Sequence, residues 1–406
     1  MAINLGGLEI SKAFLGITEV ISAYLGDVLV YSSEDTTSFI TTWRTTTPNE
    51  TITIPTNSVY VYNYNITTSD GQEFTGVTGD QTITFATAGD YDVSINIDDI
   101  IGGAFPSIFF NNTGDKLKII DIKQWGNIVW RDFSNSFYGC SNLTGSFTDV
   151  ADTSLLISLY RTFLGASSFN GDISNWNTSS VTTLDLTLYG ATSFNQPLNN
   201  WDTSSVTSMI GTFRNATSFN QDLNSWDTSN VGDMAFLFTL ATSFNGNISN
   251  WNTSSVTNMQ FLLTAAYSFN QPLNWDTSSV TLMGDTFRLA TSFNQPLNWN
   301  TSSVTDMKEM FASATSFDQS LNWNITSVTD MVQMFSNVTL STSNYDAILI
   351  YWENELDTTF PNGSGYTPTI SISFGNSQYT GTGTAAAARA SLISNFNWTI
   401  TDGGIA

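Results

Sequence analysis

The residues able to carry out acid–base or metal chemistry are few in this chain. It has no histidine, which removes the commonest general base and the commonest transition-metal ligand. Asp98 and Asp99 form a carboxylate pair of the kind that a glycosidase needs, but such pairs arise by chance among 35 acidic residues. No phosphate-binding loop, nucleophile elbow or zinc spacing occurs. We therefore expect a protein that is not an enzyme, with no catalytic residues, metal or cofactor.

The only cysteine, Cys140, excludes an internal disulfide and any cysteine-rich metal site. It lies beside apolar residues in the stretch Phe-Tyr-Gly-Cys-Ser-Asn-Leu. A nucleophilic thiol needs a base to activate it, and the chain has no histidine for this purpose. The sequence therefore favours a small thiol buried in the core over a reactive one.

Three aspartates follow tryptophans at a regular spacing, at Asp202, Asp227 and Asp276. Carboxylates repeated in this way can bind a ladder of calcium ions. The equivalent positions elsewhere hold asparagine instead, at Asn177, Asn252, Asn300 and Asn324. Because a calcium ladder would need the carboxylate in most repeats, we expect these side chains to stabilise turns.

The charge balance limits the possible partners. The chain has 11 Lys and Arg against 35 Asp and Glu, a net charge of −24. Phosphate binding needs clustered basic residues, so we expect no binding to nucleic acid or to an anionic membrane. No apolar run approaches about 18 residues, so we expect no membrane insertion. Asn, Thr and Ser dominate the polar positions; such a surface either hydrogen-bonds neutral partners such as glycans or only keeps the protein soluble.

The strongest pattern is a unit of 24–25 residues that recurs seven times in the middle of the chain. Its phenylalanines run from Phe169 to Phe317, its tryptophans from Trp176 to Trp323 and its valines from Val181 to Val328. Each valine is followed three residues later by a leucine or a methionine. A fixed period of this length is typical of a solenoid, in which each unit buries its apolar residues against its neighbours.

Each unit divides into two predicted elements. The spacing i, i+3, i+7 and i+10 of a helix face is found at Val304, Met307, Phe311 and Ala314. Ser303 followed by Asp306 resembles a capping box, so we expect a short helix here. Residues 317–323 are too few for a helix and predict a short strand and a turn. Units stacked at the strand spacing of about 4.8 Å would align the Phe and Trp residues into ladders.

A column of asparagines follows the repeated phenylalanines, at Asn170, Asn195, Asn220, Asn245, Asn270 and Asn294. In a stack of units these side chains could form a polar ladder along the turns. They could equally serve their own turns one by one, because asparagine suits turns. The sequence leaves both interpretations open.

Composition divides the chain into four parts. Residues 1–34 are apolar, duplicated and too few to fold alone, and we expect a β segment for anchoring or oligomerisation. Residues 35–133 alternate with period 2 between turn signals, which predicts an immunoglobulin- or PKD-like all-β sandwich. Residues 134–340 form the predicted solenoid, with a degenerate first repeat before the regular ones. Residues 341–406 predict an α/β cap.

Local patterns place individual elements in the second and fourth parts. Strands are expected at 51–54, 59–62, 82–85, 93–97, 108–110, 118–122 and 127–130. In the cap, Tyr345, Ile348, Leu349 and Trp352 have the spacing of an amphipathic helix. A last helix is expected at 384–395, and a final strand at 398–400.

The repeats resemble the BspA-like class of leucine-rich-repeat surface proteins over about residues 137–340. Ser-Phe-Asn-Gln-Pro-Leu, Trp-Asp-Thr-Ser and Val-Thr-Asp-Met carry this resemblance, together with the ending Trp-Thr-Ile-Thr-Asp-Gly-Gly. It implies a leucine-rich-repeat-type α/β solenoid, adhesion at a bacterial surface and no enzymatic activity. Members of that class normally carry a secretory signal, whereas Glu9 and Lys12 interrupt the apolar run that a signal needs, so we expect no signal peptide.

The opening residues resemble the N-termini of tailed-bacteriophage structural proteins, in the stretches 10–16 and 23–31. Together the two resemblances predict a non-enzymatic virion protein, assembled in the host cytoplasm and displayed on the particle surface as a fibre, tail or head-decoration component. The expected partners are other virion proteins through residues 1–34, further copies of this chain, and a glycan or protein on the host surface. Two alternatives stay open: a BspA-like bacterial cell-surface adhesin, and an architectural decoration protein that binds nothing outside its own particle.

Overall fold

The computed structural model describes residues 14–15, 18–19, 22–25, 28–32, 35–97 and 105–406. Near the N-terminus, strand β1 (Phe14–Leu15) pairs with β2 (Thr18–Glu19), and β3 (Ser22–Leu25) pairs with β4 (Val28–Ser32), both antiparallel. Most of the duplicated motif at residues 10–16 and part of its second copy at 21–26 lie outside the described residues. The carboxylate pair Asp98 and Asp99 lies outside them as well.

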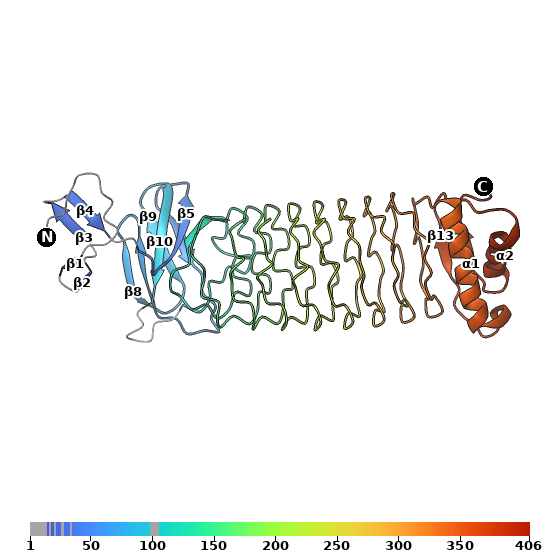
Figure 1. Ribbon diagram of the computed structural model, residues 1–406. Coiled ribbons are helices and arrows are strands. Elements are labelled where there is room, and N and C mark those ends of the chain that lie inside the picture. The colour runs from blue at the N-terminus through green and yellow to red at the C-terminus, as the bar shows by residue number, and fades with distance from the viewer. Residues whose placement is uncertain (1–13, 16–17, 20–21, 26–27, 33–34, 98–104) are drawn as a thin grey trace.

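One end of the molecule is a β region with a six-stranded sheet and a two-stranded ribbon (Figure 1). The sheet has the order β12-β11-β5-β10-β7-β8, and the ribbon pairs β6 with β9. The strands are β5 (Phe39–Thr45), β6 (Glu50–Ile54), β7 (Tyr64–Thr68), β8 (Glu73–Val77), β9 (Gln81–Phe85), β10 (Gly89–Asn96), β11 (Ile119–Gln124) and β12 (Thr144–Gly145). The strands predicted at 51–54, 82–85, 93–97 and 118–122 are thus confirmed.

Three of the predicted strands are wrong. Residues 108–110 form no strand, and 127–130 contribute only an isolated bridge from Val129 to Asp152. At 59–62 the alternation is real but belongs to a loop: Val59 and Val61 are 76% and 86% exposed, whereas Tyr62 is buried. Its hydroxyl donates a hydrogen bond to the Ser107 carbonyl at 2.9 Å, which anchors the loop without strand pairing.

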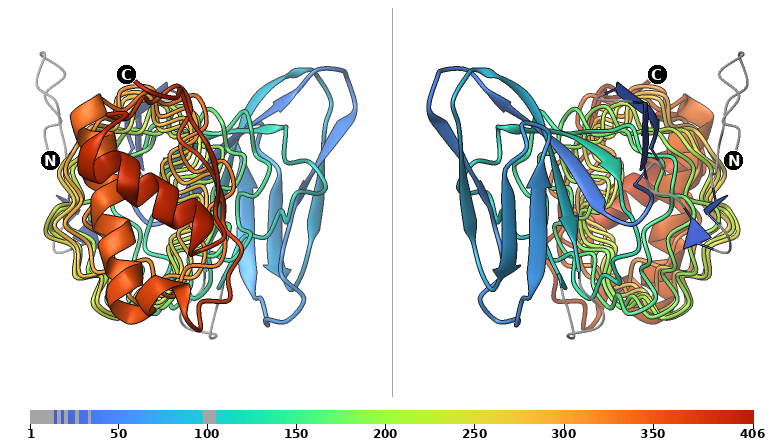
Figure 2. Two further views of the ribbon diagram at one scale, coloured as in Figure 1. Left: turned by 90° about the vertical axis from the view of Figure 1, so that its right-hand side faces the viewer. Right: turned by 90° about the vertical axis from the view of Figure 1, so that its left-hand side faces the viewer.

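The immunoglobulin- or PKD-like sandwich is also wrong, because the sheet is not a closed module. Its strand β11 pairs in parallel with β12, and β12 belongs to the first coils of the repeat region. Beyond β11, the ring of Trp125 packs edge-on against Trp176, with the ring centroids 5.5 Å apart. The core of the β region therefore continues into the core of the repeats; seen along the stack in Figure 2, the sheet is offset to one side of the coils.

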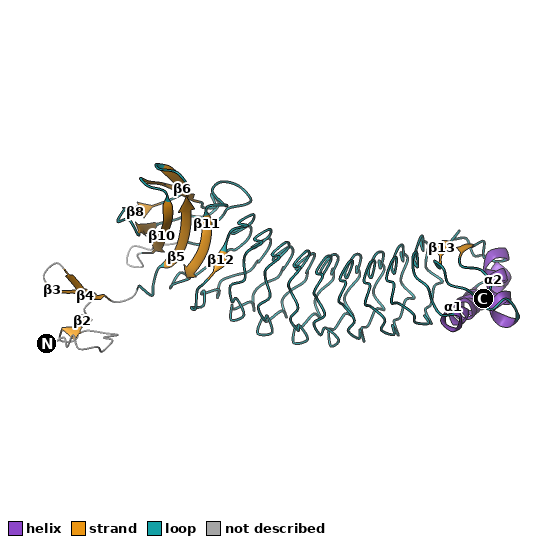
Figure 3. Cartoon of the chain, turned by 90° about the horizontal axis from the view of Figure 1, so that it is seen from above, coloured by secondary structure: helices purple, strands orange, loops and turns teal. Residues whose placement is uncertain are grey.

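The repeats form an elongated stack of coils (Figures 1 and 3). Isolated parallel β-bridges join equivalent residues of successive coils, at Ser158, Thr183, Ser208, Asp233, Asn258, Leu282, Asp306 and Asp330. The structure describes all of residues 146–341, and within them it has turns and bridges but neither helices nor extended strands. The predicted leucine-rich-repeat-type α/β solenoid is therefore wrong; the described part of the molecule is mostly β, and the few helices found in it lie at the C-terminal end.

Backbone hydrogen bonding explains why the predicted short helix does not form. The N–H of Met310 turns back to the carbonyl of Met307 at 3.3 Å, whereas the N–H of Phe311 reaches Met334 of the next coil at 2.9 Å. A helix would keep both bonds within itself. Left-handed residues such as Glu309 (φ 52°) and Ser313 (φ 61°) interrupt any helical run. The apolar spacing is nonetheless the correct guide to burial, because all four of its positions are fully buried: Val304, Met307, Phe311 and Ala314.

The capping box and the short strand predicted within each unit are also wrong, because the groups concerned do not form the bonds that a helix start or a strand requires. The Ser303 hydroxyl donates to the carbonyl of Ser278 at 2.8 Å, and Asp306 accepts from the N–H of Lys308 at 2.9 Å. Residues 317–323 contain no strand. The parallel bridges lie instead at the second residue after each repeated valine.

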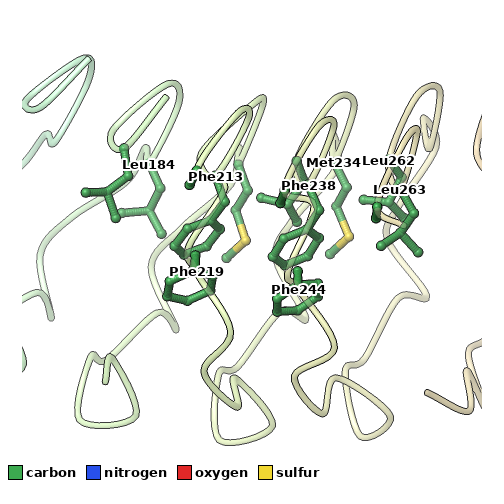
Figure 4. Close-up of a cluster of buried hydrophobic side chains, with 14 of the residues drawn as sticks. Leu184, Phe213, Phe219, Met234, Phe238, Phe244, Leu262 and Leu263 are labelled. Carbon is green, nitrogen blue, oxygen red and sulfur yellow. The ribbon is translucent and has the colours of Figure 1, made fainter. Parts of the chain in front are cut away.

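The aromatic ladders are confirmed, and Figure 4 shows part of the phenylalanine ladder in two neighbouring coils. Phe219 stacks on Phe244 of the next coil with centroids 5.9 Å apart, and Trp226 stacks on Trp251 at 6.4 Å. Within one coil, Phe238 stacks on Phe244 at 3.9 Å. Large rings buried in this way dominate the energy of a core, so each coil depends on both neighbours for its stability.

The C-terminal cap follows the prediction closely. Helix α1 (Thr342–Thr359) buries Tyr345, Ile348, Leu349 and Trp352. Helix α2 (Gly383–Ser394) and strand β14 (Thr399–Thr401) lie where expected, with a short 3₁₀ turn η2 (Pro361–Gly363) after α1. Strand β13 (Ser371–Ser373) pairs in parallel with β14, and the N–H of Phe335 donates to Ser373 at 3.0 Å. The cap therefore covers the last coil. No helix in the described part of the chain is both long and apolar enough to cross a membrane.

Candidate functional site

Each coil has two segments that bind the next coil in different ways. In the segment from the repeated Phe to the repeated Val, side chains make the bonds between coils: the indole N–H of Trp226 donates to Leu198 O at 2.9 Å, and the hydroxyl of Thr228 donates to Asn252 O at 2.9 Å. We call this the constant segment. The side chains that make these bonds hold the stack together, and the Trp residues among them recur in every repeat.

The asparagine column belongs to the constant segment and forms a continuous ladder. The N–H of Asn195 donates to Oδ1 of Asn170 at 2.9 Å, and equivalent bonds continue along the stack as far as Asp318, whose N–H donates to Asn294 at 2.9 Å. The ladder interpretation is therefore confirmed over that of isolated turns.

Replacing one rung should weaken the stack modestly. Asn220→Ala removes the acceptor of the Asn245 N–H, and we expect it to lower the free energy of unfolding by about 1 kcal/mol. Chemical denaturation checks this. Asn220→Asp is the matched control, because it keeps an acceptor oxygen as Asp318 does at the end of the ladder. Equal losses for both variants would show that the rung contributes nothing.

The carboxylates that follow the repeated tryptophans stabilise turns, as predicted. Asp202, Asp227 and Asp276 each accept the N–H of the serine two residues later at 3.0 Å. Hydrogen bonds from these serines hold the pKa of each carboxyl below its ordinary value. In the described part of the chain, no three His, Cys, Asp or Glu residues are placed to share a metal ion.

Cys140 is fully buried, as the sequence predicts. Burial raises the pKa of its thiol well above the ordinary value, so the thiol stays protonated and unreactive near neutral pH. It packs within the first coils and has no part in a site.

The segment from the repeated Val to the next repeated Ala joins the coils chiefly through its backbone, although some threonines add side-chain bonds, such as that from the Thr212 hydroxyl to Leu184 O at 2.9 Å. The N–H groups of Gly211, Phe213 and Asn215 donate to the carbonyls of the next coil at 2.9, 2.9 and 2.7 Å. These bonds impose no side-chain identity on the residues that point away from the core. These positions are the second, fourth, fifth, eighth and ninth residues after each valine, and their types change from coil to coil. Most of them are at least partly exposed, whereas some, such as Thr239, Thr264 and Asp285, are buried against neighbouring coils. We call these positions the variable face.

The variable face carries every basic residue of the stack, together with aromatic residues that lie outside the Phe and Trp ladders. All four basic residues of 134–340 occupy it, at Arg161, Arg214, Arg288 and Lys308. So do aromatic residues at Tyr138, Tyr160, Tyr189, Phe236 and Phe261. A row of chemically distinct side chains on a regular scaffold is how a repeat protein presents a binding surface.

The first half of the variable face is an arginine–aromatic cluster. The guanidinium of Arg161 lies 4.7 Å from the ring centroid of Tyr160, and that of Arg214 lies 5.1 Å from the rings of both Tyr189 and Phe236. Phe236 stacks in turn on Phe261 at 4.6 Å. Cation–π contacts of this kind hold the arginines in place without a carboxylate partner.

The second half of the variable face is an ion-pair cluster. Arg288 lies 3.1 Å from Glu309 and 3.7 Å from Asp285. Asp285 is only 8% exposed, and its burial, with Glu309 nearby, raises the pKa of its carboxyl to about 6 despite Arg288. The guanidinium of Arg288 is therefore already paired with the carboxylates of Asp285 and Glu309.

The raised pKa of Asp285 predicts a pH dependence of stability. The folded state binds this proton more tightly than the unfolded state, so its contribution is present at low pH and is lost as the pH rises through about 6. Asp285→Asn stays neutral at every pH, and we expect it to melt at a higher temperature than the parent at pH 7. The two should melt alike near pH 4, where the parent carboxyl is protonated in the folded state. A lower melting temperature for Asp285→Asn at pH 7 would contradict this account.

A groove of about 830 Å³ lies on the sheet of the β region, lined by residues of β5, β10, β11 and β12. Its two cationic side chains are already paired, Arg44 with Asp90 at 2.7 Å and Lys123 with Asp92 at 2.8 Å. It therefore offers a ligand fewer unpaired charges than the variable face does.

The fold is that of a repeat protein: a stack of repeated coils with a β region at one end and an α/β cap at the other. The surface of the stack varies from coil to coil. A family described as "Mycoplasma protein of unknown function, DUF285" matches in four overlapping stretches, at 105–215, 131–251, 198–274 and 237–348. These cover more than half of the chain, and the chain belongs to this family. Searches of curated proteins and of solved structures each found no match.

The residues that recur in every repeat do not reveal the variable face. The repeated Phe, Trp, Val and Met residues reveal the core and the constant segment. The site consists instead of positions whose residue type changes from coil to coil. The eighth residue after the repeated valine, for example, is Tyr189 in one coil, Arg214 in the next and Thr239 in the one after. Aligning the repeats with one another and comparing each column would have revealed it.

Proposed function

We propose that this chain is a non-enzymatic display protein whose repeat stack holds a contact surface away from its point of attachment. The observation that carries the proposal is the division of each coil into a constant segment, which fixes the stack, and a variable face, which is free to change. The β region and the cap lie at opposite ends of the elongated stack (Figure 1). A surface built from many coils suits weak, repeated contacts that gain strength through multivalency.

We propose further that the point of attachment is a particle, the virion of a tailed bacteriophage. The resemblance of residues 10–16 and 23–31 to the N-termini of phage structural proteins supports it. Residues 1–34 would then bind other virion proteins or further copies of this chain, and the repeats would face a host glycan or protein. Membership of DUF285 is compatible with a repeat protein that works at a surface and says nothing about a virion.

Purified particles provide the test. Mass spectrometry should find the full chain in virions, and a variant without residues 1–34 should remain a folded, soluble monomer that is missing from them. Light scattering and circular dichroism check assembly and folding. A variant that still enters particles, or an unchanged oligomer on light scattering, would refute the role of residues 1–34.

A bacterial cell-surface adhesin is the second candidate, supported by the BspA-like motifs of the repeats. If the protein is absent from particles but accessible to protease on intact bacteria, this candidate replaces the first. A protein found on particles whose removal leaves adsorption to the host unchanged would favour a purely architectural role.

A further inference from the structure

Two arginines of the variable face have no carboxylate partner among the described residues, although the chain has a net charge of −24; outside this face, Arg131 lacks one as well. Arg44, Arg288 and Arg389 are each paired with a carboxylate, at 2.7, 3.1 and 2.8 Å. Arg161 and Arg214 form no ion pair with any residue in the described part of the chain. Their Nε atoms are buried and have no hydrogen-bond partner among those residues.

Aromatic rings replace the missing carboxylates. Arg214 lies between Tyr189 and Phe236, 5.1 Å from each ring centroid, and Arg161 lies 4.7 Å from Tyr160 and 6.0 Å from Tyr138. Stacking covers the flat faces of a guanidinium, and because Nε is buried in both arginines, the terminal Nη groups are the donors left for an oxyanion. A half-buried guanidinium held in this way is prepared for a two-pronged hydrogen bond to a carboxylate or a phosphate.

The spacing of charges along the stack limits which polyanion fits. Arg161 and Arg214 come from coils two steps apart, about 10 Å along the axis at the spacing of paired strands. The coil between them presents Asp185, whose Oδ1 accepts the Ser208 hydroxyl at 2.6 Å and the Ile210 N–H at 2.8 Å. The order along the face is therefore positive, negative, positive.

A polymer with one anionic group for every two coils can meet both arginines and avoid Asp185. Duplex DNA carries a charge about every 1.7 Å along its axis, which would place phosphates against Asp185. A linear glycan with one carboxylate per disaccharide has the lower charge density that the site requires. The rings of Tyr160 and Tyr189 add apolar surface beside the arginines for the C–H groups of the sugars.

We infer that Arg161 and Arg214, with their aromatic partners, form a two-point site for a linear glycan that carries one carboxylate per disaccharide. This inference rests on the proposed display function, because it names the kind of host surface that the repeats would contact.

The test is calorimetric titration of the full chain with a hyaluronan oligosaccharide and with its carboxyl-reduced, neutral form. The acidic oligosaccharide should bind, the neutral one should not, and binding should weaken as salt is added. Arg161→Gln and Arg214→Gln should each weaken binding by about tenfold, because each removes a charge-assisted hydrogen bond. Arg44→Gln is the matched control and should bind like the parent, because Arg44 lies on β5, outside the variable face, and is already paired with Asp90.

Several results would overturn the inference: equal binding of the neutral form, tighter binding of a polyphosphodiester, unchanged binding by the double variant, or no binding to any carboxylate-bearing glycan on an array. Melting curves confirm that each variant is folded. If virions carry the protein and it fails to bind these glycans, the inference alone is lost. If the protein binds them but is absent from every particle and cell surface, the proposed function is lost instead.

Discussion

Trp251→Ala should lower the free energy of unfolding by about 3–5 kcal/mol, the usual effect of truncating a buried tryptophan. Trp251 is 3% exposed and stacks on Trp226 and Trp275, with centroids 6.4 and 6.1 Å away. Its indole N–H donates to Leu223 O at 2.8 Å, a bond that alanine cannot make. The loss lies in mid-stack, so it affects the contacts of one coil with both neighbours. Denaturant unfolding followed by circular dichroism measures the change.

Lys308→Ala is the control for this prediction. Lys308 is exposed on the variable face of a later coil and makes no ion pair with a described residue, so its loss should change stability by less than about 0.5 kcal/mol. Equal unfolding curves for the two variants would show that the tryptophan column does not support the stack.

Asp402→Ala should destabilise the C-terminal cap by about 3 kcal/mol, because it leaves a partly buried arginine without its carboxylate. The Asp402 side chain is 4% exposed; its Oδ2 accepts the Tyr345 hydroxyl at 2.7 Å and Nε of Arg389 at 2.8 Å. Asp402 directly follows β14, so its carboxylate connects the end of this strand to both α1 and α2. Thermal melting of the full chain measures the effect. Glu353→Ala is the control, since Glu353 lies on α1 and forms no ion pair with a described residue.

The same carboxylate predicts an acid limit to cap stability. Burial alone would raise the pKa of Asp402, but hydrogen bonds from Arg389 and Tyr345 outweigh it and lower the pKa below the ordinary value. The stabilisation is therefore present above the unfolded pKa of about 4 and is lost as the pH falls through the lower folded value. The difference in stability between the parent and Asp402→Ala should shrink in that acidic range. A constant difference from pH 7 to pH 2 would contradict this assignment.

The sequence predicted which residues are buried in the repeats but not the backbone that buries them. Val304, Met307 and Phe311 face the core as a helix would require, yet a coil with two left-handed residues gives the same spacing. The left-handed position falls on Phe236, Phe261 and Glu309 as well as on Gly211. Only the glycine is a recognisable signal, since bulky residues rarely adopt that conformation. The strain is balanced by hydrogen bonds to the next coil, which a single repeat does not reveal.

Elements with local signals were predicted well. Tyr345, Ile348 and Trp352 mark one face of α1, and the alternation in β9 and β10 identifies strands without knowledge of their partners. Strand β5 was missed because Thr41 and Thr42 interrupt its apolar alternation. Both hydroxyls are nevertheless bonded, Thr41 to Val93 O at 3.4 Å and Thr42 to Asp92 at 2.8 Å. Pairing with β10 makes these polar residues suitable for a central strand. Because β10 is distant in the sequence, the residues around β5 alone do not predict this pairing.

Antibody labelling of purified virions by electron microscopy tests the central claim most directly. One Fab fragment would recognise residues 150–340 and a second would recognise residues 35–97 of the β region. The display account predicts that both label the particle surface and that the first lies farther from the particle than the second. Repeats shielded inside the particle, a β region farther out than the repeats, or particles without either label would contradict it.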